Sequence, residues 1–232
     1  MRLVVNDEKI ARGARLGKIA TFVGLGFLLA GFIISLTLRD LMFLWISLGC
    51  LVVGMLISSV GTMNMNRWVR EPRADQALAQ GLKGFDDRYV LYSYSLPVPH
   101  VLLSPGGLFV LTAMGQDGKI RYDGNRFRRD FSLGRLLRIM AEEGLGRPLA
   151  EAEQEIKTLR QFLAEHESDE DVEIQNVVVF YNPRAELDVS EAPVPIVDPK
   201  GLKKAIRKQT DEKLPAKQYQ ALRKLFDEAA EA

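Results

Sequence analysis

The 232-residue chain has one cysteine, Cys50, and only two histidines, His100 and His166. A single cysteine excludes an intrachain disulfide scaffold, and so few soft ligands exclude a structural zinc site. Neither a glycine-rich phosphate loop nor a nucleophile elbow is present. Strong net charge is also missing, because 31 basic residues oppose 30 acidic ones and leave a formal charge of +1. Since 47% of the residues are hydrophobic, the chain is not disordered.

The near-zero net charge is a cancellation between two different segments. Residues 1–70 carry a net charge of +5, which leaves −4 for residues 71–232. Two long uncharged runs lie in the basic part, and a helix of about 20 apolar residues can cross a bilayer core of about 30 Å. We therefore predict three segments. Residues 1–18 form a basic N-terminal segment, residues 19–66 form a transmembrane hairpin with helices over 19–38 and 41–65, and residues 67–232 form a third segment.

Two other interpretations of the apolar runs fit less well. A core helix of a soluble protein rarely has more than about 14 apolar residues in a row, and a cleaved signal peptide has about 7–15. Basic residues flank the outer ends of the hairpin, whereas the turn between the helices holds only Arg39. The positive-inside rule therefore predicts an integral membrane protein with both termini and the main domain in the cytoplasm. Arg67, Trp68 and Arg70 are predicted to lie at the membrane interface.

The third segment has the pattern of one α/β domain with a mixed sheet. Aromatic and β-branched runs, bounded by glycine and proline, predict strands over 89–96, 100–103, 108–111, 119–122, 126–131, 174–181 and 194–197. Apolar residues at helical spacing predict helices over 74–82, 133–166 with a break, 199–209 and 215–229. Strands and helices mixed in this order are typical of an α/β fold.

Residues 100–119 (HVLLSPGGLFVLTAMGQDGK) carry a family resemblance. The glycine-proline turn between two apolar strands resembles the signature of the NERD (nuclease-related) domain family, which belongs to the PD-(D/E)XK nuclease superfamily. A looser similarity extends from Arg73 to about Arg207. The resemblance implies a restriction-endonuclease-like fold for the domain. The predicted architecture is thus an N-terminal two-helix transmembrane hairpin followed by a NERD-like α/β domain with a mixed sheet.

The residues that such a nuclease would use are replaced in this sequence. The family aspartate falls on Pro99, the family glutamate on Thr112 and the family lysine on Met114. Only Asp75, in the first helix, remains as a candidate acid. Because Mg²⁺ requires several oxygen ligands, we predict no catalytic residues, no metal and no cofactor. The leading hypothesis is an inactive binding or scaffold module, or an accessory subunit; the alternative is a membrane-tethered nuclease with relocated metal ligands.

Two clusters of basic residues are candidate binding surfaces. The first includes Arg121, Arg126, Arg128 and Arg129, which could contact phosphate groups. The second lies on the helix 199–209 and consists of Lys200, Lys203, Lys204, Arg207 and Lys208. A solvated helix face is the simplest interpretation of such runs, followed by contact with lipid or protein. Nucleic acid is the least favoured partner, because the domain has a net charge of −4. The expected partners are the lipid bilayer and a protein partner or larger membrane complex.

Overall fold

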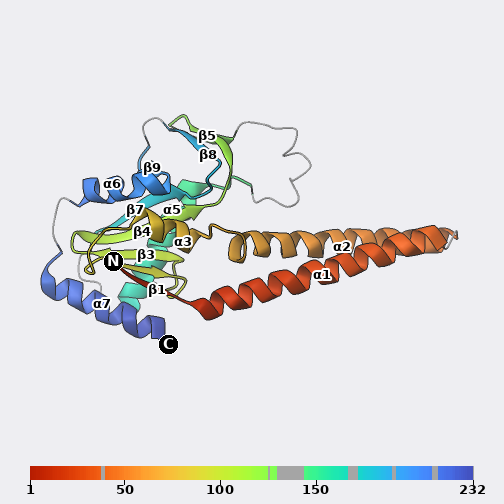
Figure 1. The fold of residues 1–232 in the computed structure, drawn as a ribbon, viewed down its shortest axis with the longest axis horizontal. Coiled ribbons are helices and arrows are strands. Elements are labelled where there is room, and N and C mark those ends of the chain that lie inside the picture. Colours follow the sequence, from red (N-terminus) through yellow and green to blue (C-terminus); the bar gives the residue numbers. More distant parts are fainter. Residues whose placement is uncertain are drawn as a thin grey trace. The chain divides into compact units, whose positions relative to one another are not determined.

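The computed structural model describes residues 1–37, 40–124, 126–129, 144–166, 172–189, 192–210 and 214–231. Within these ranges the chain divides into two compact units, each of which is described by itself. Residues 7–73 form a helical hairpin unit. Residues 1–6 belong with the described residues after 73, and together they form an α/β unit (Figure 1).

Two long helices, α1 (Asp7–Thr37) and α2 (Leu41–Trp68), make up the hairpin unit. They meet along a seam of small residues that recur every seven positions, namely Gly17, Gly24 and Gly31 on α1 and Ser47, Gly54 and Gly61 on α2. Seven residues are close to two helical turns, so each set lies on one face of its helix. The backbones nearly touch there, because a Cβ added at Gly54 would lie 2.9 Å from the carbonyl oxygen of Gly24. Ser47 Oγ also donates a hydrogen bond of 2.7 Å to the carbonyl oxygen of Gly31.

The outer surface of the hairpin is apolar. Among the described residues, every exposed large hydrophobic side chain except Leu3 and Val69 lies on α1 or α2, and Phe22 is 74% exposed. Both helices are long and apolar enough to cross a membrane. Their 31 and 28 residues correspond to about 46 and 42 Å of helix, longer than a hydrocarbon core of about 30 Å. Such a continuous apolar surface requires a non-aqueous environment.

The α/β unit is built on a mixed six-stranded sheet, which confirms the predicted fold class. Its strands, in spatial order, are β1 (Arg2–Val5), β2 (Val90–Ser93), β3 (His100–Ser104), β4 (Gly107–Met114), β7 (Ile174–Phe180) and β9 (Ile196–Val197). The β2–β3 and β3–β4 pairs are antiparallel, and the β1–β2, β4–β7 and β7–β9 pairs are parallel. Strand β1 precedes the hairpin in the sequence, whereas the other five strands of this sheet follow it.

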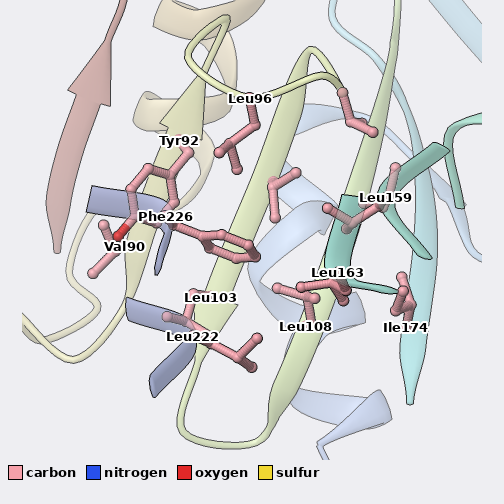
Figure 2. Packing of buried hydrophobic residues seen from close by; sticks show 13 residues of the cluster. Val90, Tyr92, Leu96, Leu103, Leu108, Leu159, Leu163, Ile174, Leu222 and Phe226 are labelled. Atoms are coloured by element: carbon pink, nitrogen blue, oxygen red, sulfur yellow. The ribbon is translucent and has the colours of Figure 1, made fainter. Parts of the chain in front are cut away.

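Helices cover both faces of this sheet (Figure 1). On one face, α5 (Pro148–Glu165) and α7 (Ala216–Glu231) contribute Leu159, Leu163, Leu222 and Phe226 to a cluster that includes Leu108 of β4 (Figure 2). On the other face, α3 (Ala74–Gly81) and α6 (Pro199–Gln209) pack against the alternate side chains of the same strands. Two hydrophobic cores form because successive side chains along each strand point to opposite faces of the sheet.

A partly buried polar contact joins β1 and β2 to α7. Tyr92 donates its hydroxyl hydrogen to Asp227 Oδ1 at 2.9 Å, and Arg2 Nη1 lies 2.9 Å from Asp227 Oδ2. Burial raises the pKa of Tyr92, and its hydrogen bond to Asp227 raises it further. The Asp227 carboxylate of α7 thus contacts both β1, through Arg2, and β2, through Tyr92.

A second, three-stranded sheet stands beside the main one in the α/β unit. It consists of β6 (Phe127–Arg129), β5 (Gly118–Tyr122) and β8 (Ala185–Val189), in that order. Strands β5 and β6 are antiparallel, whereas β5 and β8 are parallel. Buried Ile120 and Phe180, together with Leu187, form the apolar contact between the two sheets.

Several predicted elements agree with the structure, and some do not. The helices predicted over 74–82, 199–209 and 215–229 correspond to α3, α6 and α7. Strand 89–96 was predicted too long, because Tyr94 takes a positive φ of 63° that ends β2. Residues 1–18, predicted as one basic segment, contain β1 and the first turns of α1. Residues 133–143 of a predicted helix lie outside the described ranges.

Candidate functional site

Three positions singled out by the signature lie at one end of the main sheet. Thr112 and Met114 are on the last part of β4, and the β3–β4 register pairs Val101 with Val110. The paired residues end at Val101–Val110, and Pro99 immediately precedes β3 (His100–Ser104), at the same end of the sheet as Thr112 and Met114. The three positions of the expected site are therefore found at one end of the sheet.

Thr112 is the centre of a small polar cluster. Its side chain is buried, with 2% of the residue exposed, and its hydroxyl donates a hydrogen bond of 2.5 Å to Glu155 Oε2. Asn176 Nδ2, on β7, donates a hydrogen bond of 3.0 Å to Thr112 Oγ1. Glu155 belongs to α5, whose apolar stripe packs on this face of the sheet. One helix carboxylate, that of Glu155, thus contacts the residue on which the family glutamate was predicted to fall.

Apolar side chains occupy the adjoining space. Met114 is 4% exposed and packs with Ile120, Val178 and Phe180. A lysine ammonium at this position would be buried without a partner in that cluster, at high cost in free energy. Pro99 carries no side-chain ligand, and its carbonyl oxygen accepts a 2.7 Å hydrogen bond from the Tyr94 amide.

Asp75, the remaining candidate acid, and His100, one of the two histidines, are both buried. Asp75 lies in the first turn of α3. His100 Nδ1 is 3.1 Å from Ser93 Oγ, and its ring meets Tyr94 edge-on at 4.7 Å between centroids. Strand alternation places His100 on the sheet face opposite Thr112, since its neighbour Val101 belongs to the core of the Thr112 face. His100 is thus a buried structural residue.

The donor set does not fit a divalent metal. Mg²⁺ prefers six oxygen ligands in near-ideal octahedral geometry, whereas the Glu155 carboxylate accepts a hydrogen bond from the buried Thr112 hydroxyl. The cluster offers one carboxylate, from Glu155, with a threonine hydroxyl and an amide. Across the described residues, no group of three or more His, Cys, Asp or Glu side chains could hold a metal ion.

Of the four candidate binding arginines, one is committed to a structural contact. Arg129 pairs with the Asp117 carboxylate, its Nε donates to the Asp117 carbonyl oxygen at 2.7 Å, and its side chain is only 10% exposed. Arg121 and Arg128 are exposed and lie 3.6 Å from Asp188 and 3.4 Å from Asp123, respectively.

Arg126 is exposed as well. Its backbone amide donates to Asp123 Oδ1 at 3.0 Å, which is typical of a turn. Carboxylates of Asp123 and Asp188 therefore accompany the exposed arginines of this region.

Trp68 has a role within the hairpin unit that the sequence did not indicate. A Cβ added at Gly13 would lie 2.6 Å from the Trp68 ring, so the indole fills the seam where α1 has no side chain. The Arg67 guanidinium carbon lies 5.1 Å from the centroid of that ring. Arg70 is exposed just beyond the end of α2. Placement of Arg67, Trp68 and Arg70 at a membrane interface remains a prediction.

The middle of the chain matches a known protein family. Residues 67–181 match the family model of the nuclease-related domain, NERD. This part of the chain is a NERD domain. The match begins in the last turn of α2, ends just after β7, and includes Pro99, Thr112 and Met114 of the candidate site. Searches of curated proteins and of solved structures give no match for this chain. The resemblance predicted from residues 100–119 is confirmed.

Glu155 is the residue of the NERD site that sequence reasoning missed. A signal for it exists, because Glu155 lies three residues after Ala152 and four before Leu159, both of which are buried on the inner face of α5. A carboxylate inside an apolar helical stripe requires a polar partner. That partner, Thr112, could not be identified until the helix was placed on β4.

Proposed function

We propose that this protein is a membrane-anchored NERD-domain protein that does not cleave nucleic acid. It acts as a binding or scaffold module, or as an accessory subunit of a larger complex, at the cytoplasmic face of a membrane. The observation that carries the proposal is that Pro99, Thr112 and Met114 stand at one end of the main sheet, at the positions where the family resemblance predicts the nuclease side chains.

Chemistry supports this proposal. Phosphodiester hydrolysis by such a nuclease requires a metal to stabilise charge on the phosphate and a base or lysine to orient water. Thr112 is engaged with Glu155 and Asn176, and Met114 is enclosed by apolar side chains. These contacts are those of a packed interior, so the site is better suited to stabilising the domain than to binding a phosphate.

The topology of the chain supports one orientation. Strand β1 precedes the hairpin and pairs with β2, which follows it, with Val5 opposite Ser93. This pairing supports a topology in which both ends of the hairpin are on the same side of the membrane as the domain. The net charge of +5 over residues 1–70, concentrated outside the apolar runs, favours the cytoplasm for that side.

A nuclease assay tests the proposed lack of nucleic-acid cleavage. The purified full chain, in detergent, is incubated with single-stranded and double-stranded DNA and RNA in the presence of Mg²⁺ or Mn²⁺. We expect no cleavage above that of a mock purification. Cleavage that co-elutes with the protein and disappears in Glu155→Gln or Asp75→Ala would refute the proposal. Purification in mild detergent, with crosslinking to preserve a complex, tests the accessory role through stoichiometric co-elution of a second protein.

The second candidate function is a membrane-tethered nuclease with relocated ligands. Glu155 supports it, because this α5 carboxylate reaches the position of the family glutamate. That hypothesis requires metal binding by Glu155, which isothermal titration with Mn²⁺ detects directly. Heat of binding in the wild type that is lost in Glu155→Gln and kept in Glu153→Gln, an exposed acid of the same helix, would favour the nuclease. Equal signals from all three proteins would exclude it.

A further inference from the structure

Helix α6 concentrates positive charge on a domain that is otherwise acidic. It carries five basic residues and no acidic one, namely Lys200, Lys203, Lys204, Arg207 and Lys208. The rest of residues 71–232 has 18 basic and 27 acidic residues, a net charge of −9. The modest −4 of the whole segment is therefore the sum of a strongly basic helix and a strongly acidic remainder.

The basic face of α6 is held in a fixed position. Leu202, Ala205 and Ile206 are buried in the core on the inner side of the helix. Asp198 caps the N-terminus, accepting a 2.8 Å hydrogen bond from the Gly201 amide. At the start of the helix, a Cβ at Gly81 would lie 2.4 Å from the Pro199 carbonyl oxygen, so α3 and α6 are in direct contact.

The cations of α6 have no carboxylate partner in the described chain. Among the described ion pairs, none includes a residue of this helix. Lys203 Nζ instead donates to the Lys83 carbonyl oxygen at 3.0 Å, and Lys203 and Arg207 lie over the Phe85 ring at 5.1 and 5.5 Å. Lysine pairs four residues apart repel one another and destabilise the helix. The helix dipole favours Arg207 and Lys208 in the last turn, but it disfavours Lys200 in the first.

We propose that the basic face of α6 is a docking surface for an acidic segment of a partner protein, rich in Asp and Glu. The proposal deepens the proposed function by naming the surface and partner of a binding module. Eleven residues of helix are about 16 Å long, which matches roughly five residues of extended chain. Carboxylates along such a segment would meet cations at successive turns of α6, and the like-charge repulsion within the helix would be relieved.

The geometry of the α/β unit favours an acidic protein over the bilayer. Helix α6 begins just after β9, beside the C-terminal end of β7, and ends where the Gln209 carbonyl accepts a 3.1 Å hydrogen bond from Gln175, near the start of β7. Its cations are thus spread along the sheet, rather than gathered at the end from which β1 leads into α1.

The same surface is poorly suited to nucleic acid. Duplex DNA would extend past the short helix on both sides and meet the acidic remainder of the domain within a Debye length of about 8–10 Å. Phe85, the aromatic ring beneath the cations, is buried, stacks on Tyr89 at 4.1 Å and is not available to a base.

Fluorescence anisotropy with labelled hexaglutamate tests the proposal. The full chain is placed in phosphatidylcholine nanodiscs, so that no anionic lipid competes. The test variant is K200Q/K204Q/K208Q, which removes three exposed charges and leaves the Lys203 and Arg207 contacts in place. The matched control is K157Q/R160Q/K217Q, which removes three exposed charges from α5 and α7. Thermal unfolding of each protein verifies that the fold is unchanged.

We expect saturable binding that weakens about tenfold in the α6 variant and less than twofold in the control. Absence of binding at low salt, or equal weakening in both variants, would overturn the proposal. So would α6-dependent binding of a short DNA duplex, or of nanodiscs containing phosphatidylglycerol, when hexaglutamate does not bind. None of these results involves cleavage, so the docking proposal can fail while the proposed lack of nuclease activity stands.

Discussion

Replacing Gly54 with valine is expected to force α1 and α2 apart. A Cβ at this position would lie 2.9 Å from the Gly24 carbonyl oxygen and 2.9 Å from the Leu28 amide nitrogen. Ordinary contacts of a carbon atom are about 3.5–4.0 Å, and both neighbours are backbone atoms that cannot rotate away. The helices must therefore separate. Gly49 lies on the same helix, and a Cβ there would meet nothing within 4 Å. Gly49→Val is the matched control.

The size of the effect follows from two contributions. Overpacking of a close interface costs roughly 1–3 kcal/mol. Separation also weakens the 2.7 Å hydrogen bond from Ser47 to Gly31, and such bonds between membrane helices contribute about 0.6 kcal/mol. We expect Gly54→Val to lower the free energy of unfolding by roughly 2–3 kcal/mol. The control should change it by less than about 0.5 kcal/mol.

Two assays measure the separation. Titration with sodium dodecyl sulfate, followed by circular dichroism, gives the free energy of unfolding. A disulfide between Gly31→Cys and the native Cys50 reports the distance directly, because a Cβ at position 31 would lie 3.0 Å from the Cys50 Cβ and a disulfide needs about 3.5–4.5 Å. We expect rapid oxidation in the Gly49→Val background and slow oxidation with Gly54→Val. Equal stability and equal oxidation in the two backgrounds would show that the seam does not hold the hairpin together.

Two further predictions concern the α/β unit. Because the pKa of Tyr92 is raised by burial and by Asp227, its stabilising effect is present below the unfolded pKa of about 10 and is lost as the pH rises above that value. The melting temperature should fall in this range, and less steeply in Tyr92→Phe. Arg129→Gln should lower the free energy of unfolding by roughly 3 kcal/mol, because it leaves the Asp117 carboxylate buried. Arg128→Gln, at an exposed pair, should have less than about 1 kcal/mol of effect by the same thermal measurement.

The elements that were predicted correctly are those in which local sequence preferences favour the observed helix or strand. Ile174–Phe180 is rich in β-branched and apolar residues, and α6 begins at Asp198-Pro199, a combination of cap and first-turn residue that marks a helix start. Strand β1 could not be predicted in this way. Its four residues precede a charged helix, and they become a strand only because β2 offers a parallel edge.

The sequence predicted which positions make up the candidate site, but it did not predict the contacts of their side chains. The signature pointed to Pro99, Thr112 and Met114, and the prediction that the nuclease side chains are replaced rests on the sequence alone. The Thr112–Glu155 hydrogen bond depends on how α5 packs across β4, which is a long-range property. The seven-residue seam, by contrast, was present in the sequence, since Gly17, Gly24 and Gly31 recur at fixed spacing.

The pairing of β1 with β2 imposes an order on biosynthesis. β1 leaves the ribosome first, but its hydrogen-bonding partner is made only after both long helices have been synthesised. The β1–β2 pair can therefore form only after both long helices have been made. A chain whose hairpin crosses only once has β1 and β2 in different compartments and cannot complete its sheet. If both helices span a membrane, completion of the sheet would therefore depend on insertion of both of them, and a chain with a single span would leave the edge of β2 open.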